Sequence, residues 1–192
     1  TGFDYLGEPT PYGWPARSSY FGIVDLAGFP KDVYYLYQSE WHPEKKVLHL
    51  FPHWNWAPGQ DIDMWAYYNN ADEVELFVNG RSQGIRKPEK GKYHSDWRVK
   101  FEPGTVEVVS RKDGKEVARE SISTAGDPYA IRLTPDRNII RSDRKDLSYI
   151  TVEIVDKDGN LCPWAENEVH FEVDGAGYIA GVDNGSPISL EP

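Results

Sequence analysis

The sequence has 192 residues, of which 39% are hydrophobic and 14% aromatic, enough for packed cores in one or two domains. The net charge of −10 argues against a nucleic-acid partner, because nucleic-acid affinity rests on many lysine and arginine contacts with phosphate. No apolar run reaches 18 residues, and residues 1–5 have neither a basic nor an apolar leader. We therefore expect no membrane span and no signal peptide within this sequence.

The charge and the composition divide the sequence into three segments. Residues 1–46 are rich in proline, glycine and aromatic residues, whereas later residues form short alternating runs between turn pairs. Residues 127–192 follow a plausible linker and carry 13 acidic against 6 basic residues. We therefore divide the chain at residues 46 and 126.

The first segment predicts one strand, one loop and one helix. Residues 1–6 are expected to form a short strand. The three prolines and one glycine within residues 8–19 forbid regular structure there. Residues 31–41 place apolar side chains at helical spacing between Pro30 and Pro43. Without a neighbouring strand, the strand at residues 1–6 would be disordered, pair with a second copy, or lie against the following domain.

Residues 47–126 predict about seven short strands. The run at 74–78 leads into Asn79-Gly80, the residue pair that best tolerates the positive φ angles of a type I′ hairpin turn. Seven strands in eighty residues indicate an antiparallel sandwich of immunoglobulin-like type.

Residues 127–192 predict four or five further strands. The runs lie at 131–133, 149–155, 169–173 and 178–182. This number is short of a complete seven-stranded sandwich, so we expect an incomplete immunoglobulin-like domain. The expected fold is mainly β.

Two stretches of the first segment carry a family resemblance. TGFDYLGEPTPY at residues 1–12 and SSYFGIVDLAGFPKD at residues 18–32 resemble the end of the catalytic barrel of bacterial, β-galactosidase-like glycoside hydrolase family 2 enzymes. FPHWNW at 51–56 and VELFVNG at 74–80 resemble the sandwich after that barrel. DLSY at 146–149 and GVDNG at 181–185 resemble its further immunoglobulin-like domain.

The resemblance implies that the chain is the C-terminal accessory region of a retaining β-galactosidase that acts on terminal non-reducing β-D-galactosides. Residues 1–46 would be the last strand, the active-site loop and the last helix of a (β/α)8 barrel, which takes about 250 residues. The partners would be the glycoside substrate and the rest of the parent chain. Relatives of this kind suggest the bacterial periplasm or the extracellular space.

The resemblance places both catalytic glutamates upstream of Thr1, so no catalytic residue is assigned and the fragment alone is expected to be inactive. Asp4 and Glu8 would lie about 13 Å apart in an extended strand, too far for a carboxyl pair. We assign Asp4, Tyr5, Glu8 and Trp14 as candidate substrate contacts in the intact enzyme. Structural hydrogen bonding or loop packing is the alternative for each.

Aromatic residues on the sandwich suggest a second possibility. Trp54 and Trp56 would share one face if extended and could form a sugar-binding platform, although packing at the seam between sandwich and helix is favoured. The alternative for the whole chain is a non-catalytic carbohydrate-binding or adhesive immunoglobulin-like module, in which residues 1–46 are merely a linker.

Metal and cofactor chemistry are not expected. The five histidines have no metal-ligand spacing, and the single cysteine, Cys162, excludes a disulfide within the chain and is typical of a small packing residue. Residues 156–160 superficially resemble a calcium loop, but Leu161 and Asn167 occupy the positions that need glycine and an acidic residue. A hairpin turn is predicted there instead.

Overall fold

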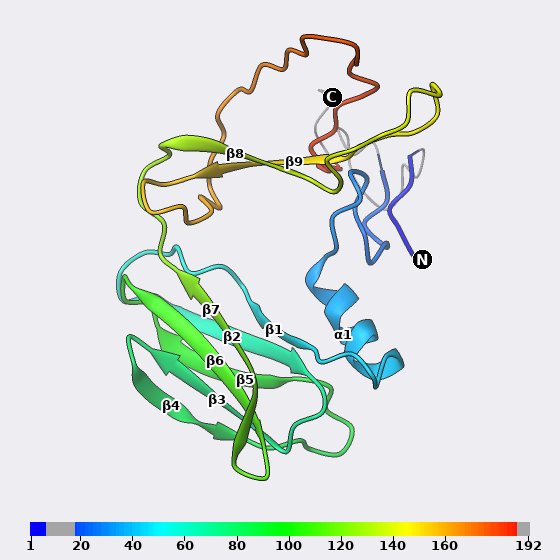
Figure 1. The fold of residues 1–192 in the computed structure, drawn as a ribbon. Helices are drawn as coiled ribbons and strands as arrows, with labels where there is room; N and C mark the ends of the chain where they lie inside the picture. The colour runs from blue at the N-terminus through cyan, green and yellow to red at the C-terminus, as the bar shows by residue number, and fades with distance from the viewer. Residues whose placement is uncertain (7–17, 188–192) are drawn as a thin grey trace.

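The computed structural model describes residues 1–6 and 18–187, and in this part of the chain the fold is mainly β with one short helix (Figure 1). The strands form three antiparallel sheets with orders β1-β2-β5, β4-β3-β6-β7 and β8-β9. The elements are α1 (Asp32–Trp41), β1 (Leu48–Phe51), β2 (Asp61–Tyr68), β3 (Glu73–Val78), β4 (Arg81–Arg86), β5 (Ser95–Lys100), β6 (Thr105–Lys112), β7 (Lys115–Ser123), β8 (Ala130–Pro135) and β9 (Ile150–Val155).

The first two sheets pack face to face around one apolar core. In β3 every second residue is buried, and Val74, Leu76 and Val78 point into the core together with residues of β2, β5 and β6. Trp54 and Trp97 are the largest fully buried side chains. Each fully buried aliphatic side chain contributes about 1.5–3 kcal/mol, so this core is the main source of stability for residues 48–123.

Two tight turns set the register of the four-stranded sheet. Asn79 and Gly80 have φ angles of 50° and 75°, as a type I′ turn requires, and they join β3 to β4. Asp113 and Gly114, with φ angles of 50° and 72°, join β6 to β7 in the same way. The hairpin predicted at Asn79-Gly80 is confirmed, and the seven predicted strands correspond to β1–β7.

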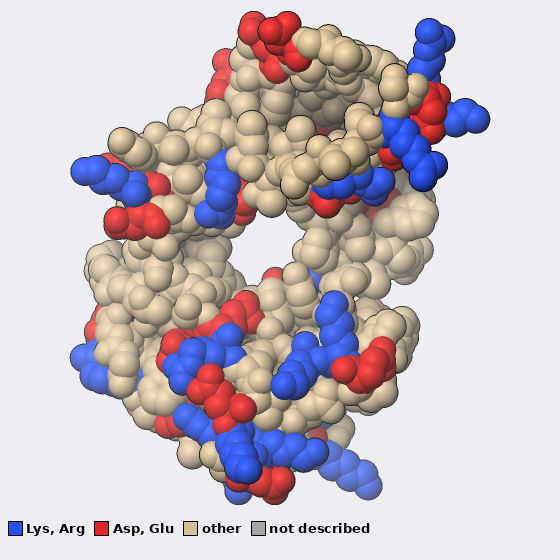
Figure 2. Space-filling model, in the orientation of Figure 1, with Lys and Arg blue, Asp and Glu red and all other residues tan. Residues whose placement is uncertain are grey.

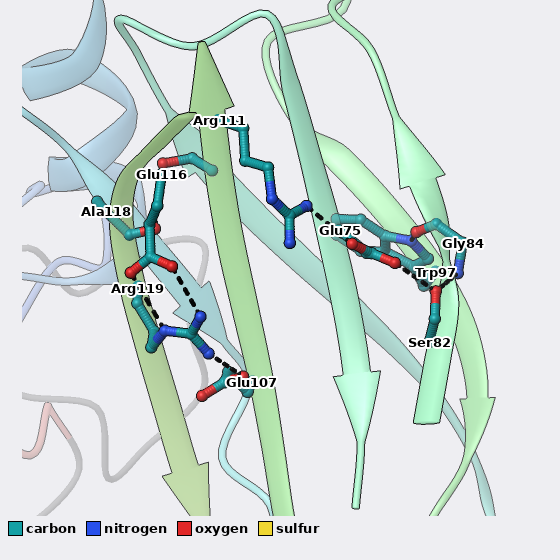
Figure 3. Close-up of polar contacts among 10 residues, drawn as sticks. Glu75, Ser82, Gly84, Trp97, Glu107, Arg111, Glu116, Ala118 and Arg119 are labelled. Carbon is teal, nitrogen blue, oxygen red and sulfur yellow. Dashed lines mark hydrogen bonds and ion pairs between the residues drawn. The ribbon is translucent and has the colours of Figure 1, made fainter. Parts of the chain in front are cut away.

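The outer face of the four-stranded sheet carries ion pairs between neighbouring strands (Figure 3). Arg111 of β6 lies 2.8 Å from a carboxylate oxygen of Glu75 on β3. Arg119 of β7 contacts both Glu107 of β6 and Glu116 of its own strand. Charges of both signs are interspersed over the sandwich in Figure 2. The Arg119–Glu116 pair is exposed and adds little to stability, whereas the Arg111–Glu75 pair is partly buried.

Helix α1 begins one residue later than predicted and ends at the predicted Trp41. It lies against the edge of the sandwich, where the His49 ring of β1 stacks on Tyr35 with centroids 3.8 Å apart. His49 Nε2 lies 2.8 Å from the Asp32 carboxylate, and its Nδ1 lies 3.8 Å from Glu120 of β7. These contacts join the helix to both sheets of the sandwich.

Residues 1–6 differ from the predicted strand. Within the described residues they form two single β-bridges, Phe3 with Val24 and Leu6 with Ser18. The segment therefore pairs with residues 18–24 of its own chain, an arrangement that the sequence analysis did not anticipate. A β-ladder forms only where two extended segments run side by side over several residues. Here each pairing involves one residue on each side, so no ladder forms.

Within residues 127–187 only the β8–β9 hairpin forms a sheet. The strands predicted at 169–173 and 178–182 are absent, because within the described residues no other segment pairs with them. All six residues of β8 are exposed, among them Ile131 at 53% and Leu133 at 60%. Of the four or five strands expected in the third segment, two are present up to residue 187.

The end of the described chain returns to the N-terminal segment (Figure 1). Gly185 is buried, and an added Cβ would approach the Asp25 carboxylate to 2.5 Å. In the space-filling view an opening separates the sandwich from the hairpin above it (Figure 2). No helix in the described part of the chain has the length and apolar character that crossing a membrane requires.

Candidate functional site

Asp4, the first of the predicted substrate contacts, has a buried carboxylate with two partners. Its Oδ1 accepts a hydrogen bond of 2.8 Å from the Gly22 backbone N–H, and its Oδ2 lies 2.6 Å from the Lys31 ammonium. Lys31 also donates to the Tyr20 carbonyl at 3.3 Å. Asp4 thereby ties residues 1–6 to the turn that precedes α1.

Gly22 makes this arrangement possible. A Cβ at this position would lie 2.1 Å from the Asp4 nitrogen and 2.2 Å from the Phe3 carbonyl carbon, distances that real Cβ atoms do not show. The backbone of Asp4 also donates to the Val24 carbonyl at 2.8 Å. Gly22, Val24 and Lys31 together form the cradle that positions Asp4, and all three lie in the stretch 18–32 that carries the family resemblance.

Tyr5 follows directly and is fixed through its backbone. Its N–H donates to Ser19 Oγ at 3.2 Å, and the Ser19 N–H donates to its carbonyl at 3.1 Å. Its side chain is 37% exposed. Glu8 and Trp14 lie outside the described residues, so the predicted set of four is located only for Asp4 and Tyr5.

The residues compared above with a calcium loop form a turn around Asp156, as predicted. The carboxylate of Asp156 accepts hydrogen bonds from the backbone N–H groups of Gly126, Asp158 and Asn160 at 2.8 to 3.0 Å. These donors, Gly126 first, lower the pKa of Asp156 to about 2. Across residues 1–6 and 18–187, no group of three or more histidine, cysteine or acidic side chains is placed to hold a metal ion.

Cys162 lies beside this turn, and its thiol faces the carbonyl of Gly126 at 3.6 Å. Burial raises the pKa of the Cys162 thiol, which keeps it protonated. The prediction of a small packing residue is confirmed.

An aromatic cleft of about 500 Å³ lies at the seam between the sandwich and the segment after β9. Two indoles from distant parts of the chain form its walls. Trp56 and Trp164 have ring centroids 5.9 Å apart and planes at 81°, and both line the cleft together with Gln60, Phe101 and Thr124. We refer to these five residues as the Trp56–Trp164 cleft.

Asn55 holds the cleft together. Its side-chain amide exchanges two hydrogen bonds with the backbone of Ala125, at 2.8 and 2.9 Å, which fixes the chain beyond β7. Its own carbonyl accepts a hydrogen bond of 3.0 Å from the Trp164 indole N–H. Asn55, in the loop between β1 and β2, therefore connects three segments of the chain.

The other tryptophans of the sandwich do not form the platform suggested by the sequence. Trp54 is in the core, where its indole N–H donates to the Glu102 carbonyl, while Trp56 turns out into the cleft. The two do not share a face, because the segment between β1 and β2 is not an extended strand. Trp65 stacks on His94 at 3.9 Å, outside the cleft.

Trp164 is the site residue that the sequence analysis missed. It is 65% exposed, and its partner Asn55 lies 109 residues earlier, so no local pattern connects the two. The sequence signal was a tryptophan directly after Cys162-Pro163, beyond the turn predicted at 156–160.

Two family models match the chain. Residues 131–192 match a family described as glycoside hydrolase family 2 C-terminal domain 5, and residues 59–118 match a domain of unknown function, DUF4982. The first match contains the β9 strand and the Asp156 turn, and the second contains most of the sandwich.

Individual relatives agree with these matches. The chain is 70% identical over 191 residues to the β-galactosidase BoGH2A of Bacteroides ovatus, covering 100% of this chain and 22% of that protein. A putative β-glucuronidase of Formosa agariphila is 40% identical over 195 residues, covering 98% and 19%. The chain spans about a fifth of the length of these relatives.

A solved structure shares the arrangement of the whole described chain. The crystal structure of a β-glycosidase from Bacteroides vulgatus superposes with a TM-score of 0.90 at 40% identity, over 98% of this chain and 24% of that one. The similarity thus extends beyond the sandwich to both flanking segments.

Proposed function

The chain belongs to glycoside hydrolase family 2, in the C-terminal region of such enzymes, and from this premise we propose that it is the accessory region of a β-galactosidase. The whole protein would hydrolyse terminal non-reducing β-D-galactosides. The identity of 70% with a β-galactosidase, against 40% with a putative β-glucuronidase, is the observation that carries this choice of sugar.

The reaction would be a double displacement with retention. One carboxylic acid protonates the leaving oxygen while a second carboxylate about 5 Å away forms the glycosyl-enzyme, which water then hydrolyses. In this proposal both glutamates belong to barrel strands that precede Thr1, and no residue of this chain acts as acid, base or nucleophile.

Residues 1–46 would be the last strand, the active-site loop and the last helix of the (β/α)8 barrel. The buried Asp4 carboxylate, held by Gly22 and Lys31, supports this placement, since active sites of such barrels lie at the ends of their strands. Tyr5, Glu8 and Trp14 would contact substrate directly. With its carboxylate engaged by Gly22 and Lys31, Asp4 would act mainly by orienting Tyr5 next to it.

Residues 47–126 would be an immunoglobulin-like accessory domain. Their strand order, β1-β2-β5 on one sheet and β4-β3-β6-β7 on the other, supports this assignment, with the fourth strand paired to the third rather than to the fifth. Residues 127–192 would belong to a second such domain, which is incomplete within this sequence.

The accessory domains would brace the barrel. The contacts of α1 with the sandwich support this role, since His49 meets Asp32 of the helix and Glu120 of β7 from a position with little exposure. Export to a bacterial periplasm or the cell surface is part of the same proposal and rests on the family resemblance.

The test is to express the complete reading frame that contains this chain and to assay it with nitrophenyl β-galactoside and nitrophenyl β-glucuronide. We expect nitrophenol release from the galactoside at least tenfold faster than from the glucuronide. Faster release from the glucuronide would overturn the choice of sugar, and a reading frame without an upstream barrel would overturn the enzyme assignment.

The chain alone provides the matching control. We expect no nitrophenol release from either substrate by residues 1–192. Turnover that disappears on Asp4→Asn would contradict the assignment of the reacting carboxyls to the upstream barrel.

A further inference from the structure

We propose that the Trp56–Trp164 cleft is a binding site for a neutral oligosaccharide, which it binds without cleaving. This inference does not depend on the proposed galactosidase activity, because none of the residues that form the cleft belongs to residues 1–46. It rests on the fixed indoles, the absence of charge in the lining and the polar groups at the edge.

Both indoles are held in place before any ligand arrives. The Trp56 N–H donates to the His53 carbonyl at 2.8 Å, and the Trp164 N–H donates to the Asn55 carbonyl at 3.0 Å. The His53 ring stacks behind Trp56 with centroids 4.4 Å apart. A sugar that stacked on these rings would therefore meet a surface that needs little ordering, which favours binding.

The perpendicular arrangement gives the cleft a floor and a wall. Flat aromatic faces match the apolar C–H face of a pyranose ring, and a second indole at 81° limits how that ring can lie. Trp164 is 65% exposed although its N–H is bonded, so a broad part of its surface is available for contact. The volume of about 500 Å³ falls in the range of ligand sites.

The chemistry of the lining points to a neutral ligand. Among the described residues that line the cleft, none is lysine, arginine, aspartate or glutamate, although the chain as a whole carries a charge of −10. Burial also lowers the pKa of His53 behind Trp56, so that ring is neutral at physiological pH. An anionic sugar would lose its hydration here without gaining a cationic partner.

Hydroxyl-binding groups are present at the edge of the cleft. Gln60 accepts a hydrogen bond from the Ala57 N–H through Oε1, which leaves its NH2 group to donate to a sugar oxygen. Thr124 accepts from the Gly104 N–H, and its own O–H can donate into the cleft. Two donors beside two indoles form the combination that recognises a polyhydroxylated ring, and without a carboxyl pair the cleft cannot hydrolyse what it binds.

The experiment is calorimetric titration of the 192-residue chain with β-1,4-galactotetraose and with cellotetraose, both neutral, and with a trigalacturonate as the anionic probe. We expect saturable binding of at least one neutral probe and none of the trigalacturonate. Trp164→Ala is expected to weaken binding about tenfold, and Trp164→Phe to restore part of the loss. Gln60→Ala is expected to weaken it about threefold.

Trp41→Ala is the matched control, because Trp41 is a 69% exposed indole on α1 that does not line the cleft. We expect its affinity to equal that of the unaltered chain. Thermal unfolding of each variant checks the fold, and Trp164 is exposed enough to be replaced without loss of the core.

Three results would overturn the proposal. These are no binding of either neutral probe at 10 mM, an equal loss of affinity for Trp41→Ala and Trp164→Ala, or tighter binding of the trigalacturonate than of both neutral probes. None of these results bears on hydrolysis by the complete enzyme, so the two proposals fail separately.

Discussion

The sandwich and the β8–β9 hairpin are built from similar sequence patterns and reach different outcomes. In β3 alternate residues are completely buried, with Val74 and Leu76 at 0% exposure. In β8 the equivalent apolar residues, Ile131 and Leu133, are 53% and 60% exposed. Alternation makes a strand amphipathic in both regions, but only the sandwich supplies a second sheet to cover the apolar face.

The sandwich therefore stabilises itself, whereas the β8–β9 hairpin depends on a further segment to cover its apolar face. A two-stranded sheet with an open apolar face is marginal in water, whereas seven strands around one core are not. In the proposed enzyme the hairpin would be covered by further parts of the longer protein.

Replacing a leucine by alanine is expected to change the free energy of unfolding far more in the sandwich than in the β8–β9 hairpin. Leu76→Ala in β3 is expected to lower the free energy of unfolding by about 2–5 kcal/mol, because it leaves a cavity in a filled core. Leu133→Ala in β8 is expected to change it by less than about 0.5 kcal/mol, since that side chain is already exposed. Urea unfolding followed by tryptophan fluorescence measures both, and equal losses would show that β8 is buried in solution.

Residues 1–6 are expected to lose their packing independently of the sandwich. Gly22→Ala would force a Cβ into the Asp4 backbone, so we expect residues 1–6 to detach and become sensitive to protease while the sandwich keeps its unfolding midpoint. Gly2→Ala is the control, because an added Cβ there meets nothing within 4 Å. Limited proteolysis with mass spectrometry checks this, and equal cleavage of both variants would contradict the cradle around Asp4.

The joint between α1 and the sandwich is expected to give a smaller effect. His49→Ala removes the hydrogen bond to Asp32 and the stack on Tyr35, a loss of about 1–2 kcal/mol. We expect faster hydrogen exchange in α1 and little change in β3 or β6. His42→Ala is the matched control, since that side chain is exposed, and an equal effect of the two variants would show that the joint does not depend on His49.

The smallest effect concerns the turn at Asp156. Its pKa of about 2 in the folded chain lies below the value near 3.9 of an unfolded aspartate, so its contribution to stability is complete above pH 4 and is lost as the pH falls through 2. We expect the Gly126 amide resonance to titrate with a midpoint near 2. Asp158→Asn serves as the control and is expected to leave that midpoint unchanged.

An Asp156 midpoint near 4 would mean that the carboxylate does not accept the Gly126 N–H in solution. Asp156→Asn is expected to abolish the titration, because the amide group does not ionise in this range. The variant therefore confirms that the observed midpoint belongs to Asp156.

The elements of the sandwich could be predicted from the sequence because their signals are local. Alternating residues in β3, the Asn79-Gly80 pair and the proline before α1 each act over a few positions, and each prediction is confirmed. The strands predicted at 169–173 and 178–182 carry the same local signal. They are absent because strand formation also needs a neighbouring segment, which a local pattern does not reveal.

The candidate sites show the same limit. Asp4 and Tyr5 were identified by resemblance, but the partners that hold them, Gly22 and Ser19, follow only from the folded arrangement. The cleft depends on Asn55 meeting Trp164 across 109 residues. Contacts of this range are set by the packing of whole segments rather than by spacing within one.

Hydrogen exchange measured on the 192-residue chain and on the full-length protein tests the central claim, that the sandwich is complete in itself and that its flanks are completed by the rest of the enzyme. We predict that the amides of β3 and β6 are strongly protected in both proteins, and that those of β8, β9 and residues 1–6 gain protection only in the longer one. Equal protection of β8 and β3 in the short chain, or no gain in the longer protein, would contradict the account.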